Sequence, residues 1–371
     1  MGSGRLGAMR WIVVLSIAGC SFAPSPSSQT SDGGGSGSAN PSHDAAVPSF
    51  RKEVTLAVNS PTELRDFPVS IIAHDPDLAQ KAQADGSDIA FTAMDGTPLA
   101  YELVAFDKTS GAIEAWVRIP SVTASAKIEL VYGGGSIASA GTVWSPAIYA
   151  AAWHFAEASG PWMDSAGGHR VTPPSPQSTA AVVPGIAGSA RQFDGIDDAT
   201  QADPSDTGLD FGMNSFTVQA WVDVAQSADA YDMVIDKGGD TNKPGYCFTL
   251  GTGNWYAEVG DDNYVATAFG TELAQLGHWT QLTAVIDRTA NNLVTYTNGA
   301  FANSLPFGTI GSIDGTTPLA IGSMQSQYRF EGIVDEVRVL KVALSADWIA
   351  AEYRNAMTRA QFVTFGPQQP H

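Results

Sequence analysis

Two short runs of the chain, at residues 254–258 and 260–264, bring aromatic rings and oxygen-bearing side chains close together in the sequence. Binding sites for small polar molecules combine aromatic surfaces with a few polar groups that fix the ligand's orientation. This composition predicts a glycan-binding rim. Its candidate residues are Trp255, Tyr256, Asp262, Asn263 and Tyr264. A β-hairpin with buried aromatic residues explains the same pattern, because neighbours on a strand face opposite ways and only one of the first two rings can face outward.

A second candidate site would hold a calcium ion. Calcium takes carboxylate and backbone carbonyl oxygens as ligands, which the loop ends of β-proteins supply. The candidates are Asp194, the carbonyl of Gly195, and Asp335. Asp335 stands in an otherwise apolar strand, where a carboxylate must be paired or ligated. Pairing with an arginine, or capping of backbone amides, is the alternative.

The carboxylates of the chain do not indicate a catalytic pair. Glycoside hydrolysis needs two carboxyl groups that face a sugar from opposite sides of a cleft. Asp335 and Glu336 are adjacent, which on a regular strand puts them on opposite faces, and Asp261 and Asp262 stand in a polar loop. The G-x-S-x-G pattern of serine hydrolases is absent from the sequence. We therefore expect no enzymatic activity, with a glycan-processing enzyme as an alternative.

The first 20 residues have the features of a targeting segment. Arg5 and Arg10 precede and flank a short apolar run that ends Ile17-Ala18-Gly19-Cys20. These four residues resemble a bacterial lipobox, which implies lipidation of Cys20, attachment to a membrane through that lipid only, and a place in the cell envelope. Ser21 resembles the pattern that is sorted to the outer membrane. Residues 21–48 are rich in Ser, Gly and Pro and predict a disordered tether.

Composition limits the possible partners. The formal net charge of −19 argues against nucleic-acid binding, which needs basic patches. An acidic surface favours solubility, and it is also compatible with calcium. Once Cys20 is lipidated, Cys247 has no second cysteine to pair with, and its aromatic neighbours predict a buried, apolar role.

Residues 49–135 predict a small β-sandwich of about six strands. Alternating runs are separated by turn residues such as Asp95-Gly96. The phrases at 66–69, 85–91 and 115–120 resemble a bacterial domain of unknown function that precedes laminin-G-like domains, sometimes in proteins with MotA/TolQ/ExbB modules. That resemblance implies no activity. A linker is expected at 136–150.

Residues 151–367 predict a second, larger sandwich. Short strands alternate with turn signals throughout, and the alternating run at 332–340 reads as an interior strand followed by a helix that begins after Ser345 and ends near Met357. The phrases at 153–157, 188–198 and 215–222 are among those that resemble laminin-G-like, concanavalin A-like domains. The resemblance implies a jelly roll in which a structural ion often clips the first strands to the last.

The sequence therefore predicts an all-β protein of two β-sandwiches, the second a concanavalin A-like jelly roll, with a short C-terminal helix. The expected function is binding or adhesion at a bacterial surface, with carbohydrate as the leading ligand class and a surface protein as the other partner considered. A structural or protein-docking component of an envelope assembly is the alternative.

Overall fold

A computed structural model of the chain describes residues 49–175, 178–225, 231–239, 243–251, 253–272, 277–324 and 327–371. The expected signal segment, Cys20 and the expected tether lie outside these residues. Residues 46–371 form one compact unit. Among the described helices, none has the length and apolarity needed to cross a membrane.

The first sandwich consists of two antiparallel sheets. Sheet I contains, in spatial order, β23 (Val363–Phe365), β1 (Phe50–Leu56), β6 (Ala126–Tyr132) and β3 (Ala90–Ala93), with β24 (Gln369–Pro370) also paired to β1. Sheet II contains β2 (Leu64–His74), β5 (Ala112–Val122) and β4 (Ala100–Asp107). Alternate residues of both sheets, such as Val54 and Val69, are fully buried between them. The six strands predicted for this part of the chain are therefore present.

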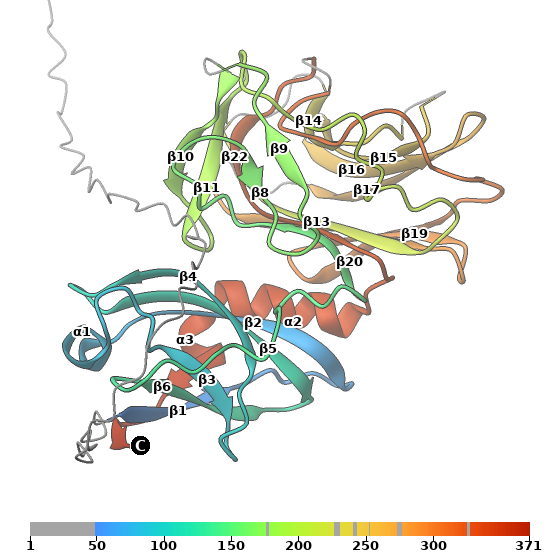
Figure 1. The fold of residues 1–371 in the computed structure, drawn as a ribbon. Helices are drawn as coiled ribbons and strands as arrows, with labels where there is room; N and C mark the ends of the chain where they lie inside the picture. The colour runs from blue at the N-terminus through green and yellow to red at the C-terminus, as the bar shows by residue number, and fades with distance from the viewer. Residues whose placement is uncertain are drawn as a thin grey trace, which may run out of the picture. The chain divides into compact units, whose positions relative to one another are not determined.

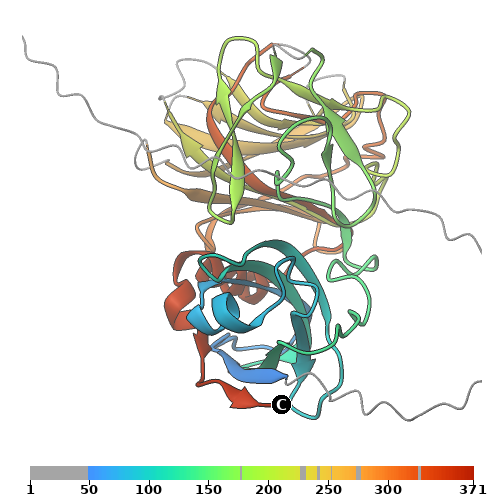
Figure 2. The ribbon, with the colours of Figure 1, turned by 60° about the vertical axis from the view of Figure 1, so that its left-hand side comes forward.

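The C-terminus of the chain belongs to the first sandwich rather than to the second. β23 pairs antiparallel with β1, with Val54 opposite Phe365, and β24 pairs with the start of β1. Figure 2 shows the red C-terminal strand beside the blue β1. The range expected for the second sandwich, 151–367, includes β23, which the structure places in the first sandwich. The partner of a strand in a sheet can lie at any distance along the sequence.

The described part of the second sandwich forms two sheets of eight strands each. Sheet III contains β10 (Ala181–Pro184), β11 (Ser189–Asp194), β22 (Glu331–Leu340), β13 (Phe216–Val224), β18 (Thr280–Asp287), β19 (Asn292–Thr297) and β20 (Ala300–Pro306), with β7 (Tyr149–Trp153) paired to β22. Sheet IV contains β17 (Val265–Glu272), β16 (Asn254–Gly260), β15 (Gly245–Gly251), β14 (Asp232–Asp236), β21 (Ala320–Ile321), β12 (Thr200–Ala202), β9 (Arg170–Thr172) and β8 (Trp162–Met163). The large hydrophobic core lies between these two sheets. The prediction of an all-β, sandwich-like second domain is confirmed.

β22 is the interior strand that the sequence predicted, and it is interrupted by a β-bulge. It pairs with β11, β13 and β7. The register shifts where β22 passes Gln219 and Trp221 of β13, and Glu336 has a φ of 47° there. Val334 and Val337 both point into the core of the second sandwich. A regular strand would put these two residues on opposite faces, so the bulge resets the alternation.

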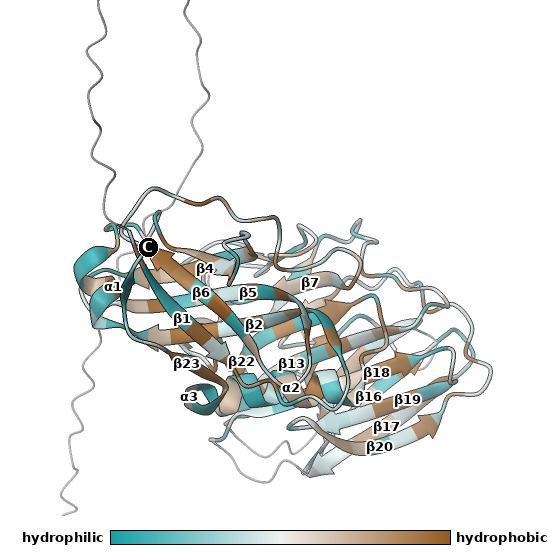
Figure 3. Ribbon diagram, turned by 90° about the horizontal axis from the view of Figure 1, so that it is seen from below, coloured by the Kyte–Doolittle hydropathy of each residue, from teal (hydrophilic) through white to brown (hydrophobic). Residues whose placement is uncertain are grey.

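Within the described residues, three helices accompany the sheets. They are α1 (Pro76–Lys81), α2 (Ala346–Met357) and α3 (Arg359–Phe362). The Ser345 hydroxyl caps α2 by accepting a hydrogen bond from the Trp348 amide, as the sequence predicted. α2 contacts β2 and β20, one strand from each sandwich (Figure 1). Figure 3 shows that α1 is mainly hydrophilic whereas β6 carries a hydrophobic stretch.

The segment expected to be a linker, 136–150, is packed against both sandwiches. Trp144 is 1% exposed, and its indole N–H donates to Glu102 of β4. Tyr149, the first residue of β7, is equally buried. β7 therefore begins inside the segment expected to be a linker. The segment is therefore part of the packed interface between the two sandwiches and does not form a separate linker.

Candidate functional site

A pocket of about 270 Å³ lies on the outer face of sheet IV. Alternation along β16 explains the face, because Trp255, Ala257 and Val259 point into the core and the residues between them point away from it. The outward side chains of β14, β15 and β16 form the floor. The lining includes Tyr231, Tyr256, Tyr328, Asp236, Cys247 and Glu258, together with two methionines, a threonine and a glycine.

The floor of the pocket is a cross-strand row of three side chains. Asp236 of β14 is paired with Cys247 of β15, which is paired with Glu258 of β16. Directly opposite residues in antiparallel strands share a face. The two carboxyl groups therefore flank the thiol. Their strands are separated by two strand spacings, so their backbones are about 10 Å apart.

Hydrogen bonds hold the row in place. The Glu258 carboxylate accepts from the Thr267 hydroxyl at 2.7 Å and from the Cys247 thiol at 3.7 Å. Asp236 accepts from the Gly238 amide at 3.0 Å. Burial, followed by the charge of Glu258, raises the pKa of the Cys247 thiol well above its usual value. A neutral thiol is a poor nucleophile, so Cys247 serves as packing, as the sequence indicated.

The walls are tyrosines. The Tyr231 ring lies 6.4 Å from the Tyr256 ring and 6.1 Å from the Tyr328 ring, and is perpendicular to both at 88°. Tyr231 and Tyr328 are 56% and 44% exposed, whereas Tyr256 is 8% exposed. Two of the three rings are therefore open to a ligand from solvent.

The structure separates the residues predicted to form the glycan rim. Tyr256 lines the pocket. Trp255 is fully buried and donates its indole N–H to the Thr297 hydroxyl at 2.9 Å, so it cannot reach a ligand. Asp262, Asn263 and Tyr264 are exposed in the turn between β16 and β17 and do not line the pocket.

Sequence reasoning missed the two carboxyl groups of the floor and two of the three tyrosines. Asp236 and Glu258 are 22 residues apart in the sequence, and only the strand register brings them to one row. Tyr231 and Tyr328 come from separate segments, each beside residues that lie outside the description. The sequence shows only the spacing of residues within one strand. This spacing does not indicate that the two carboxyl groups, or the two tyrosines, lie close together.

The residues predicted to share a calcium ion lie apart. Asp194 pairs with Glu331, and Asp335 is four residues further along β22, about 13 Å away. Asp335 is fully buried and accepts from the Ala187 and Glu336 amides. Burial and the Glu336 charge raise its pKa well above the usual range, and backbone amides already donate to both of its oxygens. Gly195 forms the positive-φ turn next to Asp194, at φ 71°.

A different group of carboxyls surrounds Asp194. Ligand oxygens of Asp194, Asp197 and Asp198 lie within 4.8 Å of one another. Burial, and then the charges of the other two residues, raise the pKa of Asp198. Backbone amides already donate to Asp194 and Asp198. The donor set fits a hard cation such as calcium, which takes carboxylate oxygens and would relieve this repulsion.

A buried ionic chain occupies the junction of the two sandwiches. Glu336 accepts from His154 at 2.7 Å and from Arg338 at 2.6 Å, and Arg338 reaches Glu352 of α2 at 3.1 Å. The Arg338 guanidinium lies 4.6 Å from the centre of the Trp116 ring of β5. Burial opposes a charged imidazole, but Glu336 outweighs it and raises the pKa of His154. These groups are at most 7% exposed, which indicates a structural role.

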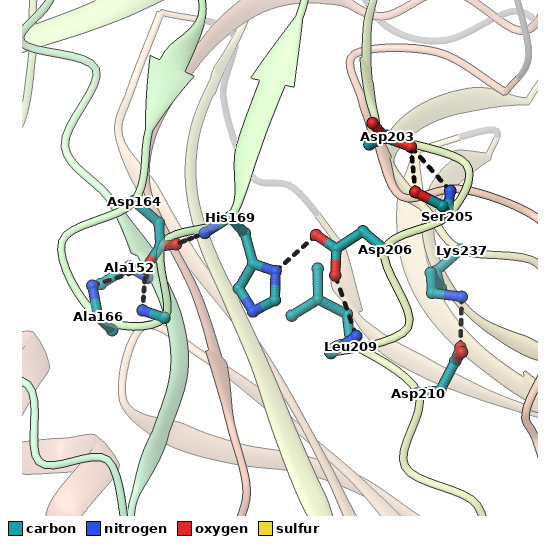
Figure 4. A network of polar contacts seen from close by, with 12 residues as sticks. Ala152, Asp164, Ala166, His169, Asp203, Ser205, Asp206, Leu209, Asp210 and Lys237 are labelled. Atoms are coloured by element: carbon teal, nitrogen blue, oxygen red, sulfur yellow. Dashed lines mark hydrogen bonds and ion pairs between the residues drawn. The ribbon is translucent and has the colours of Figure 1, made fainter.

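A second hollow, of about 330 Å³, adjoins this junction, but its carboxyls serve the fold. Glu102 accepts from Trp144 and from the Ser165 hydroxyl. Asp164 accepts from several backbone amides, including those of Ala166 and His169. Figure 4 shows Asp164 turned toward these amides.

A histidine–carboxylate pair lies close to this second hollow. The His169 ring points toward Asp206, with its Nδ1 2.6 Å from the carboxylate (Figure 4). The Asp206 carboxylate also accepts from the Gly208 amide. This pair joins the loop after β8 to the loop after β12.

Two family profiles match separate parts of the chain. A profile of the concanavalin A-like lectin/glucanases superfamily (Laminin_G_3) matches residues 194–350. A profile of a domain of unknown function (DUF2341) matches residues 85–150. Among curated proteins, none matches the chain.

Solved structures with a similar arrangement include toxin binding domains. The binding domain of Paraclostridial Mosquitocidal Protein 1 superposes with a TM-score of 0.48 at 14% identity, over 56% of this chain and 52% of that one. The botulinum neurotoxin serotype G binding domain gives 0.47 at 13% identity, over 55% and 50%. The serotype D ligand-binding domain in complex with N-acetylneuraminic acid gives 0.46 at 11% identity, over 56% and 50%. The chain spans about half the length of each of these structures.

The order of the two profiles along the chain agrees with the two sandwiches. The first profile covers β3 to β6 and the segment that follows, and the second covers most of sheets III and IV. The chain is thus similar, in this order along the sequence, to a DUF2341 domain and to the concanavalin A-like domain of the Laminin_G_3 profile.

Proposed function

We propose that this chain is a non-enzymatic, lipid-anchored protein of the bacterial surface that binds a saccharide in the pocket of sheet IV. The observation that supports it is the pocket itself, in which tyrosine rings stand beside carboxyl groups on the face of the sheet that points away from the core. The anchor is the Cys20 lipid expected from the lipobox.

The chemistry of the lining suits a sugar. A pyranose offers apolar C–H surfaces, which pack on aromatic rings, and hydroxyls, which donate to carboxylates. The volume of about 270 Å³ lies just below the range of about 300–1,000 Å³ for small-molecule sites, which favours a ligand of about one or two sugar units. The exposed Tyr231 and Tyr328 rings supply the stacking surface, and Asp236 and Glu258 supply the acceptors.

A glycan panel tests this proposal. The melting temperature of the full chain is measured with each sugar, and hits are titrated by calorimetry, because a ligand that binds only the folded state raises the melting temperature. We expect Tyr231→Ala and Tyr328→Ala to abolish the shift. Tyr264→Ala is the matched control, since Tyr264 is 60% exposed and outside the pocket.

The outcomes separate the alternatives. Sugar binding that survives both pocket variants refutes the assigned site. A panel in which no sugar binds refutes the saccharide ligand and favours the protein-docking role in an envelope assembly.

A calcium ion at the Asp194, Asp197 and Asp198 loop is part of the same proposal. It would cross-link the turn after β11, next to the edge where β11 pairs with β22. Its role would be structural, because these residues do not line the pocket.

Glycoside hydrolysis is the second candidate function for the pocket. The observation that favours it is the pair of carboxyls, Asp236 and Glu258, on either side of Cys247. Release of reducing ends from a bound glycan, lost in Glu258→Gln while binding persists, would establish it. Binding without turnover would leave the non-enzymatic role in place.

A further inference from the structure

The pocket of sheet IV has a charge as well as a shape. Its described lining contains two acidic residues, Asp236 and Glu258, and no Lys, Arg or His. A ligand in this pocket therefore meets two carboxyl groups on its floor.

The arrangement of the tyrosines adds to that charge. Tyr231 is perpendicular to Tyr256 and to Tyr328, so the three rings present faces in different directions around the same space. The face of an aromatic ring is the negative part of its quadrupole, and it attracts an ammonium group within about 6 Å of its centre. Rings at right angles therefore form the walls of a cage for a cation.

Burial strengthens this preference. Asp236 is 2% exposed and Tyr256 is 8% exposed, so the floor is largely withdrawn from water. Electrostatic attraction is stronger where water is excluded, because the local dielectric is low. The raised pKa values of Cys247 and Tyr256, caused by burial and then by the Glu258 charge, report the same negative potential.

We propose that this pocket selects ligands that carry a positively charged ammonium group, such as an amino sugar with a free amine or a trimethylammonium headgroup, over neutral and anionic ligands of the same size. The inference rests on the pocket assigned above as the saccharide site and specifies its ligand class. The ammonium lies among the Tyr231, Tyr256 and Tyr328 rings, and Glu258 and Asp236 balance its charge from below.

Two isosteric comparisons test the charge separately from the shape. Choline and 3,3-dimethylbutan-1-ol have the same shape and differ in the charge of the central atom. Glucosamine, glucose and N-acetylglucosamine differ in whether the 2-substituent is an ammonium. Each is titrated into the full chain by calorimetry at pH 6.5, at low and at high salt.

We expect choline and glucosamine to bind at least about tenfold more tightly than their neutral counterparts. This preference should shrink at high salt, because salt screens charge. Tyr328→Phe should retain it, since the ring face remains, whereas Tyr328→Leu should lose it. Glu258→Gln should reduce it while keeping the size of the side chain, and Tyr264→Leu should leave it unchanged.

The results distinguish this inference from the saccharide proposal. Equal binding of glucosamine and glucose, abolished by Tyr231→Ala, overturns the ammonium preference and leaves saccharide binding in place. Ring-dependent binding of choline without binding of any sugar supports the ammonium site and overturns the saccharide. If none of the five probes binds, the ammonium site is refuted.

Discussion

Glu114 of β5 is a carboxyl group buried between the two sandwiches, and its ionisation lowers the stability of the folded state. Burial, and then repulsion by Glu336, raise its pKa from 4.5 to about 7. His154 and Arg359 act in the opposite direction and offset this only in part. A carboxyl whose pKa is raised on folding stabilises the folded state less and less as pH rises through the interval between its two values.

Replacing Glu114 by Gln should remove this pH dependence. The shift from 4.5 to about 7 corresponds to about 3 kcal/mol of the free energy of unfolding. That contribution is present below pH 4.5 and is lost by pH 7. We therefore expect the variant to unfold at higher urea than the parent at pH 8, and at similar urea at pH 4.5. Glu53→Gln, at an exposed ion pair, is the control, and an equal effect of both variants at pH 8 would contradict the assignment.

The Asp194 loop makes a second prediction at the scale of residues. Calcium should raise the melting temperature of the full chain relative to EDTA, and Asp194→Asn should abolish the shift, because it removes one of three clustered carboxylates. Asp335→Asn should keep the shift, since Asp335 is buried about 13 Å along β22. Loss of the shift in the Asp335 variant instead would restore the ligand set predicted from the sequence.

Among the elements, β22 connects the two sandwiches through its bulge. The extra residue allows Val334 and Val337 to fill the core of the second sandwich while Glu336 and Arg338 join the ionic chain at the junction. Glu336 adopts a positive φ of 47°, which costs a non-glycine residue on the order of 1 kcal/mol. Its two ion pairs offset this strain.

Removing the Glu336 carboxylate from the buried ionic chain should strongly destabilise the folded protein. Glu336→Ala leaves Arg338 and His154 buried without their common partner, and loss of one member of a buried pair typically costs about 3–5 kcal/mol. Urea unfolding of the variant measures this loss. The exposed pair of Glu53 and Lys127 gives a comparison, because its removal should cost less than about 1 kcal/mol. Similar losses for the two pairs would show that the junction is open to water.

The positions of strands and helices could be predicted from the sequence better than the pairing between them. The strands of the first sandwich, the interior strand at 332–340 and the helix capped by Ser345 follow from local alternation and capping. The bulge at Glu336 has no glycine to mark it, so the alternation appeared regular across it. The pairing of β23 with β1 and the row from Asp236 to Glu258 depend on contacts between distant segments, which one strand's periodicity does not encode.

At the scale of the whole described molecule, the two sandwiches share one hydrophobic cluster. It contains Val69 of β2, Trp144 of the connecting segment, Val285 of β18 and Ile349 of α2. Residues from both sandwiches and from the helix between them are therefore buried together. Separation of the sandwiches would expose this surface to water, which opposes independent unfolding.

Unfolding should consequently be a single cooperative transition. Tryptophan fluorescence, far-ultraviolet circular dichroism and calorimetry of the full chain should give coincident midpoints. Trp144→Ala should lower the midpoint seen by each of these probes. Two resolved transitions in the parent would contradict this coupling.

The order in which a ribosome delivers the strands of sheet I has a cellular consequence. β1 emerges about 300 residues before β23 and β24, and at about 5–20 residues per second this delay is roughly 15–60 s. Until then, the edge of β1 that β23 and β24 will cover stays open, and an open edge invites pairing with other chains. A nascent chain in this condition is open to pairing with other chains at that edge. Sheet I is therefore completed only after β23 and β24 have been synthesised, so strands made late finish the domain that began first.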